Sequence, residues 1–172
     1  MKKGYPIVLA LFLFCFSTAC KKESFHFENE LEKSEKVWLT FKEASGNSYS
    51  YLVTNLTWTG TETETLITIE NGVATARSYV ERQRQTPPDP PVTIQEWTED
   101  TTSLYSHRLG PLPLTLDEVY AVAKNEFLKN RLHVKFSFRA DNNGMISSAG
   151  YVPDNCMDDC FTGIRISSIE RL

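Results

Sequence analysis

The sequence predicts an α+β fold, in which an antiparallel sheet has two helices packed on one of its faces. Two segments with apolar residues at helical spacing are each followed by several short segments of β-branched and aromatic residues. Asn71-Gly72 joins two of these short segments and is typical of a hairpin, because a type I′ turn needs positive φ at both positions. The order of helix, strands, helix and strands also suggests an αβββ duplication.

The first helix is predicted from Glu28 to Ala44. Its apolar residues fall on one side at helical spacing: Leu31, Val37, Trp38, Phe41 and Ala44. On the opposite side, Glu32 and Lys36 form a favourable pair four residues apart. Ser45-Gly46-Asn47 then supplies a stop signal.

Four strands are predicted next, at Tyr49–Trp58, Thr65–Glu70, Val73–Gln83 and Val92–Glu99. The connector before the last of them, residues 86–91, is rich in proline and cannot enter a sheet interior, because proline has no N–H to donate. A rigid loop is the favoured interpretation of this connector. A proline-rich ligand for an aromatic groove is the alternative.

The second helix is predicted from Thr115 to about Asn130. It begins with a capping box, in which the Thr115 side chain caps one amide and Glu118 reaches back to another. Its apolar stripe consists of Leu116, Val119, Tyr120, Ala123 and Phe127. The three last strands are predicted at Leu132–Arg139, Met145–Val152 and Gly163–Ile169.

Length and charge restrict the possible partners. The chain has 172 residues and a net charge of −4, and removal of residues 1–19 would leave 16 Lys and Arg against 22 Asp and Glu, a net charge of −6. No basic patch stands out, which argues against nucleic acid as a partner. The remaining length suits a single α+β domain over residues 28–172.

The N-terminal residues resemble a bacterial lipoprotein signal. Lys2 and Lys3 precede a short apolar run, Tyr5–Phe16, which is too short for a spanning helix of about 20 residues. Small residues then lead to Cys20, the expected site of acylation. Residues 1–19 are therefore predicted to be a signal peptide, and residues 20–27 a lipidated cysteine with its tether to the membrane.

Ordinary secretion is the alternative, since Ser17 and Ala19 also suit a signal-peptidase site and lipoproteins normally carry Leu where this chain has Ser17. The number of cysteines favours lipidation. If Cys20 carries lipid, Cys156 and Cys160 remain as an even pair in an oxidising compartment. No Asp follows Cys20 directly, so the resemblance implies an outer-membrane lipoprotein facing the periplasm or the cell surface.

Several short motifs together resemble one family. They are Trp38, Tyr49-Ser50-Tyr51, Ile69–Val73, Leu114–Val119, Phe136–Gly144, Asp158-Asp159 and Ile164–Ile169. In this order the chain resembles the secreted bacterial proteins of domain-of-unknown-function family 6174. It departs from that pattern in lacking a Cys-x-Cys after the first strand, where Thr57-Trp58 stands, and in having Met145-Ile146 after Gly144. The family label implies no activity.

The segment from Cys156 to Cys160 has the sharpest local pattern. A disulfide that closes a small loop between the last two strands is the favoured interpretation. Redox exchange is disfavoured because the Cys-x-x-Cys spacing is missing and the flanking acids raise a thiol pKa. A cation site formed by Asp154, Asp158 and Asp159 is a further hypothesis, although the spacing matches no EF-hand loop.

No catalytic constellation or cofactor site is predicted. The three histidines, His26, His107 and His133, are far apart, and no Gly-x-Ser-x-Gly elbow is present. Trp58 and Trp97 are expected on neighbouring strands, where exposed rings would suit a sugar or peptide and buried rings would belong to the core. The core is the favoured interpretation.

The sequence therefore predicts a lipid-anchored cell-envelope protein that binds an envelope protein or polymer and is not an enzyme. One alternative is a hydrolase or inhibitor-like module that acts on envelope polymers, which would require a deep cleft holding a histidine near an acid and a hydroxyl. Another alternative is a surface protein that binds glycans or peptides through the tryptophan-bearing strands.

Overall fold

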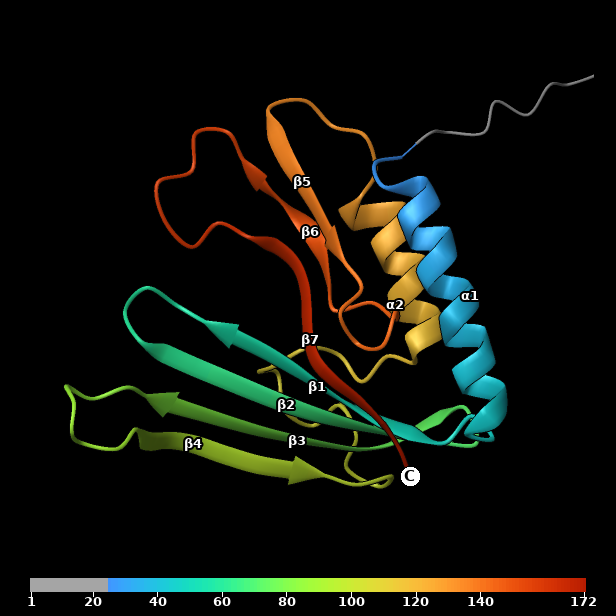
Figure 1. The fold of residues 1–172 in the computed structure, drawn as a ribbon. Coiled ribbons are helices and arrows are strands. Elements are labelled where there is room, and N and C mark those ends of the chain that lie inside the picture. The colour runs from blue at the N-terminus through green and yellow to red at the C-terminus, as the bar shows by residue number, and fades with distance from the viewer. Residues whose placement is uncertain (1–24) are drawn as a thin grey trace, which may run out of the picture.

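The computed structural model describes residues 25–172 (Figure 1). It is an α+β arrangement in the coarse sense, a seven-stranded antiparallel sheet with two α-helices. Its elements in chain order are α1 (Glu28–Ala44), β1 (Tyr49–Leu56), β2 (Thr61–Glu70), β3 (Val73–Gln83), β4 (Val92–Glu99), α2 (Leu116–Val122), the π-helical segment η1 (Ala123–Phe127), β5 (Val134–Arg139), β6 (Ser148–Pro153) and β7 (Thr162–Arg171).

The predicted bounds of α1, β3 and β4 agree with the structure. β2 begins at Thr61 rather than at Thr65. The four extra residues are polar and lack an apolar alternation, but they pair with residues 80–83 of β3. β1 ends at Leu56 rather than at Trp58, where the chain turns toward β2.

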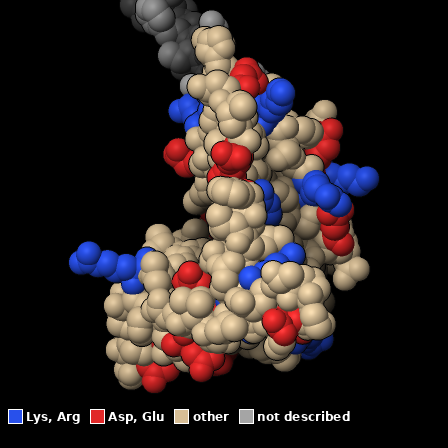
Figure 2. Space-filling model, turned by 90° about the vertical axis from the view of Figure 1, so that its left-hand side faces the viewer, with Lys and Arg blue, Asp and Glu red and all other residues tan. Residues whose placement is uncertain are grey.

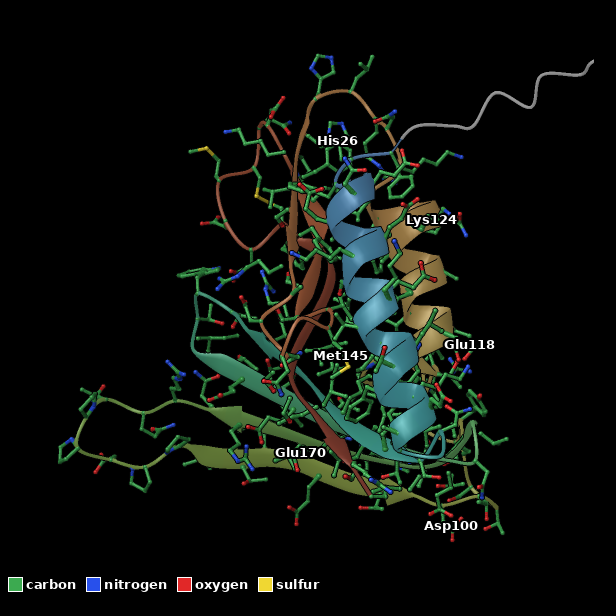
Figure 3. The ribbon with its side chains drawn as sticks, turned by 45° about the vertical axis from the view of Figure 1, so that its right-hand side comes forward. His26, Asp100, Glu118, Lys124, Met145 and Glu170 are labelled. Carbon is green, nitrogen blue, oxygen red and sulfur yellow. A yellow bond between two sulfur atoms is a disulfide. The ribbon has the colours of Figure 1, made fainter. Side chains whose placement is uncertain are left out.

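The strand β6 begins later than predicted because two apolar residues before it belong to the core. Met145 and Ile146 are buried ahead of Ser148, and Figure 3 shows Met145 between α1 and the sheet. The N–H of Ile146 donates to the hydroxyl of Tyr120 at 2.9 Å instead of to a neighbouring strand. Apolar character alone therefore does not distinguish this buried turn from a strand.

The helix α2 begins with the predicted capping box. Thr115 Oγ1 accepts from the N–H of Glu118 at 3.3 Å, and Glu118 Oε2 accepts from the N–H of Thr115 at 2.7 Å. The regular α-helix is shorter than predicted, because η1 follows Val122. There the N–H of Leu128 donates to the carbonyl of Ala123, five residues earlier, at 2.9 Å.

The two helices lie side by side (Figure 1). The hydroxyl groups of Ser34 in α1 and Tyr120 in α2 are 2.7 Å apart in a buried hydrogen bond. Trp38 Nε1 donates to Asp117 Oδ1 at 3.0 Å, and Lys42 Nζ lies 2.6 Å from the other oxygen of Asp117. These contacts join α2 to α1 between Ser34 and Lys42.

The hairpin at Asn71-Gly72 connects β2 to β3, as predicted. Both residues have positive φ, 50° for Asn71 and 79° for Gly72. The N–H of Gly72 donates to the carbonyl of Asn47 at 2.8 Å, which ties the hairpin to the turn after α1. The dipeptide therefore has the backbone conformation that its sequence predicts.

The strands follow the order β4-β3-β2-β1-β7-β6-β5. One cluster of buried side chains connects the helices with the central strands. Its members include Leu31, Trp38, Tyr49, Tyr51, Ile67, Ile69, Leu116, Tyr120, Ile146 and Ile166. The apolar stripes predicted for both helices thus contribute to a single core.

The last residues of the predicted tether contact the domain. Phe25 forms a β-bridge with Lys129, and the N–H of His26 donates to the carbonyl of Leu128 at 2.9 Å. The ring of His26 stacks on Phe136, with 4.1 Å between the ring centroids. The predicted signal peptide and the predicted lipidation site, Cys20, lie outside the described residues.

Candidate functional site

The sheet forks at β7. The part of β7 that follows Arg165 pairs with β1, whereas Thr162–Arg165 pairs with β6. β1 pairs with β7 only as far as Val53, whereas its pairing with β2 continues to Leu56. In Figure 1, β5 and β6 rise from this point while β1 to β4 extend to the side, so one sheet opens into two diverging parts. We call this point the fork.

A cleft of about 410 Å³ lies at the fork, a size within the range of small-molecule sites. It is bounded by the ends of β1 and β7, by α2 with η1, and by the loop before α2. Apolar side chains line most of it, among them Val53, Leu112, Leu114, Val122, Phe127 and Ile164. Figure 2 shows the molecule from the side on which the sheet diverges, with an indentation between its narrow upper part and its broad lower part.

Among the described residues that line the cleft, one has a positively charged side chain. Arg165 extends from β7, and its Nη1 donates to Asn55 Oδ1 of β1 at 3.0 Å. The guanidinium carbon lies 3.9 Å from the ring centroid of Phe161. These two contacts hold the guanidinium at the point where β1 and β7 separate.

The ring of Phe161 occupies a space that two glycines provide. A Cβ at Gly150 would lie 2.5 Å from the ring, and a Cβ at Gly163 would lie 2.8 Å from it. Neither distance is possible for a real side chain without a shift of its neighbours. Gly150 and Gly163 face each other on β6 and β7, so this part of the sheet is adapted to carry Phe161 and, through it, Arg165.

Tyr51 supplies a polar atom of the cleft wall that is already satisfied. Its hydroxyl donates to the carbonyl of Leu114 at 2.6 Å. Burial, followed by the nearby Tyr49 and Glu118, raises the pKa of Tyr51 well above the ordinary value. The phenol therefore stays protonated at neutral pH and offers no base to a bound ligand.

The structure brings together two residues that the sequence singled out separately. The N–H of Trp58, in the turn after β1, donates to Asp159 Oδ2 at 2.5 Å. Asp159 belongs to the loop between β6 and β7. The turn after β1 is thus hydrogen-bonded to the loop between β6 and β7, in addition to the contact of Asn55 with Arg165 at the fork.

The predicted disulfide is present between Cys156 and Cys160, with 6.0 Å between their Cα atoms. The loop that it closes leads directly to Phe161. Within the loop, the N–H of Cys160 donates to the carbonyl of Asp158 at 2.8 Å. The disulfide restricts the conformations of this loop, which positions Phe161 and the carboxylate of Asp159 that accepts from Trp58.

The hypothetical cation site has no matching geometry in residues 25–172. No group of three or more His, Cys, Asp or Glu side chains there is placed to hold a metal ion. Asp159 interacts with Trp58. The backbone N–H of Asp154 donates to the carbonyl of His133 at 2.9 Å, which closes the end of the β5–β6 pair.

The expectation that Trp58 and Trp97 lie on neighbouring strands is wrong. Trp97 lies on the edge strand β4, whereas Trp58 follows β1, and both β2 and β3 intervene. Trp58 is 75% exposed and is not a core residue. Trp97 is half-buried and stacks between Tyr79 and His107, with centroid distances of 5.2 and 4.3 Å.

A second polar cluster, which the sequence did not reveal, lies where β4 ends. Arg77 of β3 forms a two-pronged ion pair with Glu99, with both N–O distances at 2.9 Å, and both side chains are almost fully buried. Arg77 also donates to the carbonyl groups of His107 and Pro111. Figure 3 shows Asp100, where the segment held in this way begins, at the end of the molecule opposite His26.

Glu99 is held as an anion by its surroundings. Burial by itself raises the pKa of this carboxyl, but hydrogen bonds from Arg77 and from the N–H groups of His107 and Tyr105 outweigh burial and lower the pKa to about 2. Side chains alternate along β3, so Arg77 lies on the same buried face as Tyr79. This alternation was the signal in the sequence that Arg77 is buried. Only the pairing of β3 with β4 reveals that Glu99 is its partner.

The cluster contains a histidine near an acid and a hydroxyl, the combination that a hydrolase would need. Its arrangement differs from a catalytic triad, because Glu99 Oε1 and Ser106 Oγ both lie 3.2 Å from the same atom, His107 Nδ1. A triad places the acid on one ring nitrogen and the nucleophile on the other. None of the three residues lines the cleft at the fork. The cluster therefore fits a structural role in fastening the loop.

No family model, curated protein or solved structure matches the chain. The resemblance to family 6174 accordingly stays a prediction. No helix within residues 25–172 is long and apolar enough to cross a membrane.

Proposed function

We propose that the protein is a lipid-anchored, non-enzymatic domain of the bacterial cell envelope, and that the cleft at the fork is its binding site. The basic and apolar N-terminal run that leads to Cys20 supports the anchor and an outer-membrane location. The cleft supports the binding role. It combines apolar walls with one positioned guanidinium, which is the usual composition of a small-molecule site.

The proposal includes the finer description of the fold, two helices on one face of the sheet and an αβββ duplication. The hydrogen bonds between α1 and α2 and their shared core support the first part. The strand order supports the second. Read along the sheet, both halves descend in chain order, β4-β3-β2-β1 and then β7-β6-β5, and each half follows a helix. The cleft would then lie at the junction of the two repeats.

Filling the cleft tests the binding role. Val122 lines the cleft from α2, whereas its neighbour Ala121 is exposed on the same helix and does not line it. We expect Val122→Phe to abolish saturable binding of a neutral naphthylamine dye, because the larger ring occupies the space, and Ala121→Phe to leave binding unchanged. The measurement is a fluorescence titration of the Cys20→Ser chain, which needs no detergent, with circular dichroism to verify folding.

Equal dye binding by the folded Val122→Phe and Ala121→Phe chains would refute the cleft as the site. The same refutation would follow if the parent chain bound no dye at all. The matched pair separates occupation of the cleft from the general effect of an added aromatic ring on α2.

A further inference from the structure

We propose that the ligand of the cleft is a fatty acid, whose apolar chain lies in the cleft while Arg165 binds the carboxylate at the mouth. This inference rests on the proposed function of the cleft as a binding site. It adds the chemical class of the ligand and the residue that selects it.

The charge of the cleft is the first argument. Arg165 is the only charged side chain among the described residues that line it. Within residues 25–172, Arg165 has no carboxylate partner, in contrast to Arg77, Arg82 and Arg139, each of which pairs with an acid. These three guanidinium groups are neutralised by the protein itself, whereas that of Arg165 is available to an external anion.

The orientation of the guanidinium is the second argument. A guanidinium has five N–H donors, of which one binds Asn55, and its face is covered by Phe161. The remaining donors lie in the guanidinium plane, where they suit the two oxygens of a carboxylate. Because Asn55 and Phe161 hold the group before a ligand arrives, less conformational entropy is lost on binding.

The walls give the third argument. Val53, Leu112 and Phe127 are among the apolar side chains beyond Arg165, and the Tyr51 hydroxyl is engaged by the carbonyl of Leu114. A polar ligand would leave its own hydrogen-bonding groups unsatisfied there, at a cost of about 1–3 kcal/mol for each group. A hydrocarbon chain has no such groups.

The number of charges distinguishes a carboxylate from a phosphate. A phosphate monoester carries a charge of about −1.5 to −2 at neutral pH and is normally met by more than one cation. The cleft offers one guanidinium, which balances a single negative charge. A fatty acid therefore fits better than a phosphorylated lipid fragment.

Titration with dodecanoate, dodecanol and dodecyl phosphate, each below its micellar concentration, tests the inference on the Cys20→Ser chain. We expect dodecanoate to bind at one site and dodecanol and dodecyl phosphate to bind more weakly. Arg165→Met keeps the stem over Phe161 but removes the charge, and we expect it to weaken dodecanoate binding about tenfold or more. Arg165→Lys restores part of the affinity. Arg84→Met, which removes a cation that does not line the cleft and is paired with Glu62, serves as the control and leaves binding unchanged.

Equal affinity for dodecanoate and dodecanol, unaffected by Arg165→Met, would overturn the fatty-acid inference. The binding role of the cleft would survive that result if Val122→Phe still abolished binding of both ligands. Tighter binding of dodecyl phosphate than of dodecanoate would overturn the assignment to a carboxylate. If Val122→Phe left all three affinities unchanged, the proposed function itself would fail.

Discussion

At the scale of single residues, the burial of Arg77 with Glu99 has the clearest energetic consequence. Both side chains are almost fully removed from water, and each satisfies the other together with carbonyl and N–H groups of the loop after β4. Removing one partner of such a pair leaves a buried charge without compensation, which costs several kcal/mol. The pair thus fixes the loop after β4, and this loop contributes Leu112 and Leu114 to the cleft.

Arg77→Met is expected to lower the free energy of unfolding by about 3–5 kcal/mol, because Glu99 would remain buried without its cation. Arg82→Met is the matched control on the same strand. Arg82 pairs with Glu64 at 2.7 Å, but both side chains are about one-third exposed, so we expect a much smaller loss. Chemical denaturation of both variants measures the difference, and similar losses would contradict the special role of the buried pair.

The same carboxyl predicts a pH dependence. The pKa of Glu99 is lowered from 4.5 to about 2 in the folded chain, so the folded state binds this proton less readily than the unfolded state. Its contribution to stability is therefore complete above about pH 4.5 and is lost as the pH falls toward 2.

Denaturation curves between pH 2 and 6 measure this contribution, and Glu99→Gln should flatten the dependence in that interval. An equally steep loss of stability in Glu99→Gln would assign the dependence to other carboxyl groups. Asp100 is such a group, since hydrogen bonds from Thr102 and Ser103 also lower its pKa to about 2.

At the scale of elements, the β2–β3 hairpin depends on the conformation of Gly72. Its φ of 79° belongs to the left-handed region, and a Cβ there would lie 2.3 Å from Asn47 Nδ2. Gly46 also has positive φ, 59°, but no atom lies within 4 Å of its position for a Cβ. A comparison of substitutions at the two glycines therefore separates the cost of backbone strain from the cost of steric contact.

Gly46→Ala is expected to lower the free energy of unfolding by about 1–2 kcal/mol through the left-handed backbone alone. Gly72→Ala should cost more, because Asn47 must also move and the N–H of Gly72 holds the carbonyl of Asn47. Thermal or chemical denaturation compares the two variants. A larger loss of unfolding free energy for Gly46→Ala than for Gly72→Ala would contradict the argument that the contact with Asn47 adds to the cost.

Elements governed by neighbours in the sequence were predictable. The capping box of Thr115 and Glu118, the Asn71-Gly72 hairpin and the disulfide of Cys156 all depend on residues a few positions apart. Elements that depend on a distant partner were placed less well. The polar start of β2 is a strand because residues 80–83 pair with it, and Met145-Ile146 is a buried turn because Tyr120 accepts its N–H.

At the scale of the whole molecule, the start of the domain restricts the distance to the membrane. Phe25 and His26 are fastened to residues Lys129 and Leu128, so the domain begins five residues after Cys20. Even a fully extended chain of five residues spans only about 18 Å. A lipid on Cys20 would therefore hold the end of the molecule that carries His26 close to the bilayer.

Cys20→Ser is expected to move the protein from the membrane fraction to the soluble fraction, because acyl chains supply the proposed anchor. Fractionation followed by mass spectrometry of the N-terminus measures both location and modification. Cys15→Ser is the control, since this residue lies within the predicted signal peptide. Retention of the Cys20→Ser chain in the membrane fraction would refute the lipid anchor.

By itself, the sequence determined the content of helix and strand, the turns between adjacent strands and the cysteine pair, because these follow from contacts within a few residues. The tertiary structure alone decided the strand order, the fork at β7 and the meeting of Asn55 with Arg165 across it. The contacts between β1 and β7 join segments separated by more than a hundred residues. Their geometry depends on how the two parts of the sheet pack around one core, which no local pattern encodes.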